Sequence, residues 1–271
     1  MRTSEFAPHK KKSLEDYMDN NQLEKYIGAL CNYEFNRPFD SQLELQKEGN
    51  LEVFFSPFEY VNEQAKIVLV GISPGATQAN NANVCARNLI RSCETLEAVS
   101  KAAKATGAFS GALRNNLVNL LDHVLINQRL GIRSCDLLFG EYSHLLHSTS
   151  VFRYPTLLNG KPISSAKKAL KSHLLKDMID TCLAKECRQL PDSAFYVPMG
   201  QGVDEVLLYL CDNGVLRREQ VLIGLPHPSG ANAERISYFL GKKERERLSN
   251  KTNPDKIDAA KNKLLSQLRT A

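Results

Sequence analysis

The chain has 271 residues, of which 42% are hydrophobic and 24% are charged, and its formal net charge is +5 at pH 7. This length and composition are typical of one large globular domain, or of one domain with an appendage, and such a chain buries a sizeable core without disulfides. The sequence shows no membrane-spanning apolar run and no signal-peptide pattern, so we expect a cytoplasmic protein and exclude an integral membrane protein.

Seven cysteines are spread through the chain without a Cys-x-x-Cys pair or a Cys/His cluster at metal-ligand spacing. We therefore expect reduced core cysteines, no metal and no cofactor. The charge is uneven, because ten Lys or Arg but only four Asp or Glu lie between Arg235 and the C-terminus. A basic segment of this kind indicates a polyanionic partner such as nucleic acid, and it is equally typical of a solvated helix face with mixed charges.

The first half of the chain is expected to place helices around one buried strand. Ser13 and Asp16 form a capping-box pattern, and apolar residues at helical spacing predict a helix over 14–30. After a loop rich in polar and aromatic residues, the apolar run 66–70 predicts a strand. A helix is predicted over 84–105, and an apolar stripe predicts another helix after it, formed by Leu113, Leu117, Leu120, Leu121, Val124 and Leu125.

The second half alternates strands and helices. Strands are predicted at 149–154, 194–198 and 220–224, and helices at 165–187, 201–213 and 232–241. Continuous apolar strands separated by helices indicate a mostly parallel sheet covered on both faces, here of about four strands. The predicted fold class is therefore α/β, with a helical extension at 1–65, an α/β domain at 66–241 and a basic helical tail at 242–271.

Two loops follow predicted strands, at the carboxyl edge where open parallel sheets bind ligands. In the first, G-I-S-P-G, Gly71 and Gly75 allow close approach of the backbone, and Pro74 biases Ser73 away from the helical region. The loop lacks the Lys of a P-loop and the pattern of a nucleophile elbow. Taken alone, it is also typical of a sharp turn from strand to helix.

The second loop, L-P-H-P-S-G-A-N, holds His227 between two prolines. Ser229 and Asn232 are placed to cap the helix that follows. A rigid imidazole beside a helix N-terminus suits an anion or a polarised carbonyl oxygen. A single histidine is often structural, but the position at the ligand edge of the sheet favours a functional role for His227.

Together, and in this order, the two loops resemble motifs 1 and 2 of the uracil-DNA glycosylase superfamily. The segment T-S-V-F-R-Y-P is similar to the T-N-V-V-K-C-R-P strand of its bacterial branch, and V-P-M-G-Q-G-V-D-E-V-L resembles the strand-Gly-helix segment that lies between the two motifs. The resemblance covers residues 66–240. It implies a three-layer α/β/α fold and an enzyme that flips a nucleotide out of DNA and hydrolyses its N-glycosidic bond without a metal.

The resemblance also implies a role for each matching residue. Ser73 takes the place of an Asp or Asn that orients the attacking water, and Ser150 takes the place of an Asn that reads the base. His227 would stabilise the departing base anion, while Ser229 would bind a flanking phosphate. The resemblance also implies a pocket wall formed by Gly71, Ile72, Pro74 and Gly75, and a minor-groove segment at Gly230–Arg235, which contains Asn232. One of Phe54, Phe55 and Phe58 would stack on the flipped base, and any of them could instead be core.

Both serines are smaller than the residues they replace, and this difference bears on mechanism and substrate. A serine without a partner is no general base, so catalysis would depend on charge stabilisation or on another group, such as Asn80, Asn81 or Asp136. The trimmed pocket favours a modified pyrimidine over uracil. The bacterial branch often carries an iron–sulfur cluster, and the cysteine spacing here predicts none.

The main interpretation is therefore a monofunctional DNA glycosylase, which acts on duplex or single-stranded DNA in base-excision repair or antiphage defence. We expect a monomer with no membrane partner. One alternative is a catalytically inactive nucleic-acid-binding module with the same fold. Another is an enzyme that acts on free nucleosides or nucleotides, against which the basic C-terminal segment argues mildly.

Overall fold

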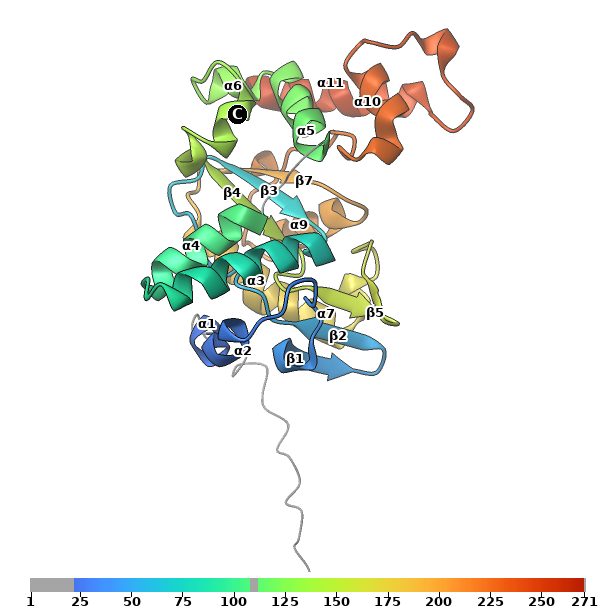
Figure 1. The fold of residues 1–271 in the computed structure, drawn as a ribbon. Helices are drawn as coiled ribbons and strands as arrows, with labels where there is room; N and C mark the ends of the chain where they lie inside the picture. The colour runs from blue at the N-terminus through green and yellow to red at the C-terminus, as the bar shows by residue number, and fades with distance from the viewer. Residues whose placement is uncertain (1–21, 108–111, 271) are drawn as a thin grey trace, which may run out of the picture.

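The computed structural model describes residues 22–107 and 112–270. The chain is α/β, and a small parallel sheet lies near its centre (Figure 1). The sheet has the order β4 (Leu146–Ser150), β3 (Ile67–Gly71) and β7 (Phe195–Pro198). In this register Gly71 lies beside Ser150, and Val70 lies beside both Thr149 and Pro198. The carboxyl ends of the three strands therefore meet at one edge, as the sequence predicts.

The predicted fourth strand, 220–224, is reduced to one parallel bridge between Tyr196 and Val221. Gly224 has a φ of +143°, and a Cβ atom there would lie 2.7 Å from the carbonyl oxygen of Ala260. Ala260 belongs to α11 (Pro254–Thr270), which therefore packs directly against this backbone. The close approach turns the chain away from β7, so among the described residues the parallel sheet has three strands and not four.

The N-terminal region contains strands that the sequence analysis misses. A second, antiparallel sheet has the order β1 (Glu44–Glu48), β2 (Leu51–Phe54), β5 (Thr156–Leu158) and β6 (Lys161–Pro162). Gly49, with a φ of +57°, lies in the turn between β1 and β2. Before this sheet the structure shows short helices, α1 (Gln22–Lys25) and α2 (Ile27–Cys31). The predicted cap at Ser13 and Asp16 lies outside the described residues.

Several predicted boundaries are also corrected. The predicted helix 84–105 is two helices, α3 (Ala76–Arg91) and α4 (Leu96–Gly107), separated at Cys93, which has a φ of +58°. The predicted strand 149–154 is wrong beyond Ser150, where β4 ends. Val151 still donates to Gly71, the last residue of β3, and Phe152 donates to Ile72, both at 2.9 Å. The predicted helix 165–187 begins only at His173. It then runs without a gap through α7 (His173–Met178), a π-helical stretch (Ile179–Leu183) and α8 (Ala184–Gln189).

The other helices lie close to their predicted positions. The apolar stripe forms α5 (Ala112–His123) and α6 (Ile126–Arg129), with Leu125 in a left-handed conformation between them. The last two predicted helices are α9 (Val203–Asp212) and α10 (Ala233–Phe239).

Alternate residues of β3 enter two separate cores. Val68 and Val70 belong to the core with α3, α4, α7 and α9, whereas Ile67 and Leu69 belong to the core with α5, α10 and α11 (Figure 1). Leu264 of α11 is fully buried in the second core. The last helix of the basic segment 242–271 therefore packs on the sheet unit. No helix in the described part of the chain is long and apolar enough to cross a membrane.

Candidate functional site

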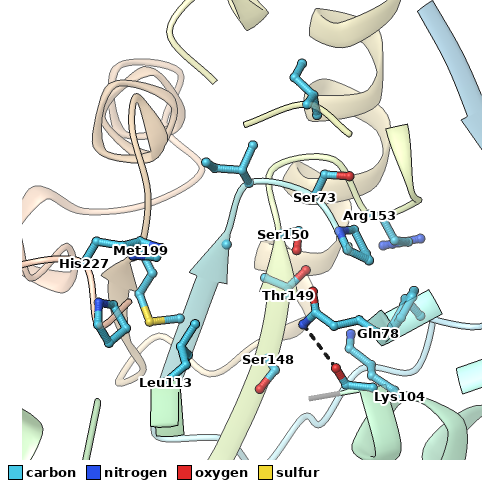
Figure 2. A pocket seen from close by; sticks show the side chains of 17 residues that line it. Ser73, Gln78, Lys104, Leu113, Ser148, Thr149, Ser150, Arg153, Met199 and His227 are labelled. Atoms are coloured by element: carbon cyan, nitrogen blue, oxygen red, sulfur yellow. Dashed lines mark hydrogen bonds between the residues drawn. The ribbon is translucent and has the colours of Figure 1, made fainter. Parts of the chain in front are cut away.

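A cavity of about 310 Å³ lies at the carboxyl ends of β3 and β4. The G-I-S-P-G loop lines it, together with β4 residues and the loop that carries His227. Figure 2 shows His227 and Met199 on one side of the end of β3, and Ser73, Ser150 and Arg153 on the other. The two loops that the sequence singles out are thus walls of the same cavity.

Most of the residues assigned from the sequence line this cavity, namely Phe58, Gly71, Ile72, Ser73, Pro74, Ser150 and His227. Gly75, Ser229 and Asn232 do not. Gly75 is the N-cap of α3, and its N–H donates to Gln78 Oε1 at 3.0 Å. Ser229 lies next to His227, since its N–H donates to His227 Nδ1 at 3.2 Å.

The predicted capping by Ser229 and Asn232 is wrong, because neither side chain bonds to a backbone N–H of the helix that follows. Asn232 Nδ2 donates to Ser229 Oγ at 3.4 Å, and Asn232 Oδ1 accepts from Arg235 Nη1 at 3.0 Å. The three side chains therefore form a local chain of hydrogen bonds behind His227, and they stiffen the loop without capping it.

The ring that reaches the cavity is Phe58. Phe54 and Phe55 are buried away from it, and Phe55 stacks on Tyr26 with ring centroids 4.4 Å apart. Phe58 lies against the end of α4, where a Cβ atom on Gly107 would come within 2.7 Å of its ring. Glycine at 107 therefore allows the aromatic ring to occupy the cavity wall.

The Ser73 hydroxyl is used for structure. Ser73 Oγ donates to the carbonyl of Tyr154 at 3.3 Å and accepts from the N–H of Thr156 at 3.1 Å. It thereby ties the first loop to the segment that leads from β4 to β5. Because the hydroxyl hydrogen is already donated to Tyr154, Ser73 is less suited to orient an attacking water than the sequence suggests.

His227 is held as a neutral hydrogen-bond donor. Its Nδ1 accepts the N–H of Ser229, so the neutral ring carries its hydrogen on Nε2. Burial lowers the pKa of His227 below its ordinary value, which keeps the ring uncharged near neutral pH. The Nε2–H is then the group that the ring can offer to a molecule in the cavity.

Several polar residues of the cavity wall were not assigned from the sequence, namely Gln78, Lys104, Ser148, Thr149 and Arg153. Gln78 Nε2 donates to the carbonyl of Gly107 at 3.1 Å, so this amide fastens the first loop to the end of α4 (Figure 2). The alternative water-positioning groups do not line the cavity: Asn80 instead accepts from Tyr33 Oη at 2.9 Å and from the N–H of Asn36 at 2.7 Å. Asn81 and Asp136 also lie outside the wall.

A buried charged cluster lies beside this wall. Glu186, from α8, accepts from Lys104 Nζ at 2.9 Å, from His147 Nε2 at 2.6 Å and from Arg153 Nη2 at 3.0 Å. Although burial alone would raise it, Lys104 and Arg153 hold the pKa of Glu186 well below its ordinary value. His147 Nδ1 accepts from the N–H of Asn62, and burial followed by the charge of Lys104 lowers the pKa of His147 to about 4. Glu186 is therefore an anion shared by two cations and a neutral imidazole.

Residue spacing in the sequence does not predict this cluster, because its members come from α4, β4, the segment after β4, and α8. The one available signal is a charged residue inside an otherwise apolar helical stripe, as at Lys104 and Glu186. Within residues 22–107 and 112–270, no group of three or more His, Cys, Asp or Glu is placed to hold a metal ion. The described cysteines are all free thiols.

Comparison with known proteins adds one relative. The chain is 34% identical over 202 residues to "Uncharacterized protein YoxB" of Bacillus subtilis (strain 168), and the matched region is 74% of this chain and 79% of the relative. No protein-family model matches the chain. No solved structure matches it either.

Proposed function

The chain belongs to the same family as YoxB of Bacillus subtilis, and we propose that it is a monofunctional DNA glycosylase of the uracil-DNA glycosylase type. The observation that carries this proposal is that the G-I-S-P-G and H-P-S-G loops line one cavity at the carboxyl edge of a parallel sheet. Helices on both faces of that sheet support a three-layer α/β/α fold of the glycosylase kind. In this proposal a base flipped out of DNA enters the cavity and its N-glycosidic bond is hydrolysed.

The size of the cavity supports a flipped base as its ligand. A volume of about 310 Å³ is near the lower limit for small-molecule sites and is too small for a stacked duplex. A base inside a duplex is inaccessible, so the nucleotide must leave the stack at a cost of about a few kcal/mol, recovered from contacts in the pocket and along the phosphates. Because Ser150 is small, the wall also leaves room for a substituent, which favours a modified pyrimidine over uracil.

His227 supplies the main catalytic contact in this proposal. Cleavage of the bond leaves negative charge on the base and positive charge on the sugar. A neutral Nε2–H, held in place by the bond from Ser229 to Nδ1, would stabilise the base oxygen where this charge develops. Loss of one such preorganised donor typically lowers the rate by about 10²–10³-fold.

One observation favours the second candidate, a nucleic-acid-binding module without hydrolysis. No Asp or Glu lies among the described residues that line the cavity. The Ser73 hydroxyl and the Gln78 amide are both engaged with backbone groups. A glycosylase built on this wall would depend on stabilising the leaving base, with water attacking the sugar cation without a strong general base.

The test is a substrate screen. Single- and double-stranded oligonucleotides that contain uracil or modified pyrimidines are incubated with the protein, and abasic sites are revealed as strand breaks by alkali. We expect breaks with at least one modified pyrimidine, and a loss of about 10²-fold or more with His227→Ala. His144→Ala, at an exposed histidine outside this cavity, is the matched control and should retain the wild-type rate.

Two other outcomes of the screen would distinguish the glycosylase from the alternative functions. DNA binding that falls with salt, without any abasic product, would identify the binding module. Release of base from free nucleosides but not from oligonucleotides would identify a nucleoside enzyme. For the cell, the proposed setting is the cytoplasm, where excision would serve DNA repair or defence against phage with modified DNA.

A further inference from the structure

Arg153 is a buried cation with one free nitrogen. The residue is only 8% exposed and lies in the segment after β4. Its Nε and Nη2 donate to Glu186 Oε2 at 3.2 and 3.0 Å, and Nη2 also donates to the carbonyl of Cys182 at 3.1 Å. In the described part of the chain, Nη1 has no hydrogen-bond partner, yet it is not one of the fully buried unpaired atoms. Arg153 lines the cavity, and because Nε and Nη2 are engaged, Nη1 is the nitrogen left to bind a ligand there.

Two cations beside the cavity, Arg153 and Lys104, are directly paired with one carboxylate, while Glu59 interacts with both from a longer distance. Lys104 also lines the cavity, and both cations are paired with the single carboxylate of Glu186. His147 is neutral because burial lowers its pKa to about 4. The other carboxylate of this region, Glu59, accepts from Tyr154 Oη at 2.6 Å and from the N–H of Leu23 at 3.3 Å, and it forms no ion pair with another described residue. One positive charge at the cavity wall is therefore left without a directly paired anion.

A guanidinium in this position is suited to an anionic ligand. Nη1 has no partner among the described residues, so a ligand oxygen can bind it without breaking a hydrogen bond within the protein. Arginine bonds to carboxylate and phosphate oxygens are among the stronger hydrogen bonds in proteins. Among the other polar groups on this side, Ser73 Oγ and the Gln78 amide already have partners, and the hydroxyls of Ser148, Thr149 and Ser150 carry no charge. Arg153 is therefore the group on this wall that is ready to select a ligand.

We propose that Arg153 makes the cavity selective for a nucleotide that carries an anionic oxygen group, which its Nη1 binds directly. The group is a carboxylate on the base or a phosphate of the same nucleotide. This inference rests on the proposed function, because it names the substrate class of the same cavity. Glu186 and the carbonyl of Cys182 position the guanidinium, and Lys104 adds to the positive potential.

Titration of the whole protein with small ligands tests the proposal. The probes are 2′-deoxyuridine, its 5′-monophosphate and 5-carboxy-2′-deoxyuridine, and binding is measured by isothermal titration calorimetry. We expect at least one anionic probe to bind about tenfold or more tightly than the neutral nucleoside. The probe that gains affinity tells whether the anion is on the base or on the sugar phosphate. Equal affinity for all three probes, or binding of none, would overturn the inference.

Two variants assign the preference to Arg153. Arg153→Lys keeps a cation beside Glu186 but has no second nitrogen for the ligand, so the anion preference should fall to about threefold or less. Lys263→Ala, at an exposed position on α11, is the control and should keep the preference. A folded Arg153→Lys protein that retains the tenfold preference would overturn the assignment.

A spectroscopic readout covers the case in which the Arg153 variants do not fold. In the wild-type protein, the anionic probe should shift the side-chain Nε–H resonance of Arg153, and the neutral nucleoside should not; no shift with either would overturn the inference. The abasic-site assay tests the proposed function separately. Strand breaks without anion preference would support the glycosylase proposal and contradict this inference. Anion preference without strand breaks would support this inference and contradict the glycosylase proposal.

Discussion

The backbone N–H of Thr156 donates a hydrogen bond to Ser73 Oγ at 3.1 Å and thereby joins the start of β5 to the loop that follows β3. Ser73 Oγ in turn donates to the carbonyl of Tyr154 at 3.3 Å. One hydroxyl therefore links the parallel sheet to the antiparallel sheet and holds the cavity wall between them. This arrangement gives Ser73 a structural role that can be separated from catalysis.

Ser73→Ala should destabilise the protein. The substitution leaves the N–H of Thr156 without its partner, while the carbonyl of Tyr154 still accepts from Thr156 Oγ1 at 2.9 Å. An unpaired buried group costs about 1–3 kcal/mol. We expect a loss of this size in the free energy of unfolding, measured by urea denaturation. Ser148→Ala is the matched control, because Ser148 also lines the cavity and its hydroxyl bonds to no other described residue. Unchanged stability in Ser73→Ala would contradict the structural role.

His227 should give base excision a pH dependence set by its lowered pKa. Burial keeps the ring neutral, and Nδ1 can accept from Ser229 only in that form. Protonation would place two N–H groups against each other, so the loop would move as the pH falls through the pKa of His227. The single-turnover rate should be constant near neutral pH and should fall only below the ordinary histidine value of about 6.5. An inflection above that value would contradict a neutral His227.

The sequence predicts the two motif loops well for a specific physical reason. The apolar run of β3 is buried on both faces, and Gly71 and Pro74 end it abruptly, so the position of the loop is determined locally. The parallel arrangement then brings the ends of β3, β4 and β7 to one edge. His227 reaches that edge even though its predicted strand is only a bridge at Val221.

Contacts between distant segments explain what the sequence could not predict. The fourth strand is lost because Ala260, in the last helix, packs on Gly224. The capping of α10 fails because Asn232 bonds to Ser229 and Arg235. Arg153 and Glu186 come into contact only in the folded chain, and no local sequence pattern predicts that contact. Local patterns therefore located the cavity but not the charge beside it.

The buried His147 should make the folded protein less stable as the pH falls. Its pKa is about 4 in the folded state, whereas an unfolded histidine has a pKa of about 6.5. Between these values the unfolded chain binds a proton that the folded chain does not, so stability is complete above about pH 6.5 and is lost down to about pH 4. The free energy of unfolding should fall in that window by an amount on the order of 3 kcal/mol. His147→Gln, which cannot titrate, should show a clearly shallower slope in urea denaturation between pH 7 and pH 4.5, and an unchanged slope would contradict the neutral buried ring.

Glu186→Gln should be far more harmful than the loss of an exposed ion pair. The substitution removes the carboxylate with which Lys104 and Arg153 are directly paired, so two buried cations would lose that counter-charge. Breaking a buried pair in this way costs about 3–5 kcal/mol. Glu52→Gln, which breaks the more exposed pair with Lys47, is the matched control and should cost about 1 kcal/mol or less. Similar losses in the two variants, measured by urea denaturation, would show that Glu186 does not neutralise the cluster.

The basic C-terminal segment should contribute to DNA affinity through exposed lysines of α11, if that face binds phosphates. Deleting 242–271 cannot test this, because Leu264 is fully buried in the second core and its loss would disrupt the fold. Lys256 and Lys263 are exposed on the same helix and can be replaced by Ala without opening the core. Each phosphate contact contributes about 0.9 to the slope of log affinity against log salt on duplex DNA, so the double variant should lower that slope by about 1.8. Fluorescence anisotropy over a range of salt concentrations measures it, with Lys171→Ala, an exposed lysine outside this helix, as the control. An unchanged slope in the double variant would mean that these lysines form only a solvated helix face.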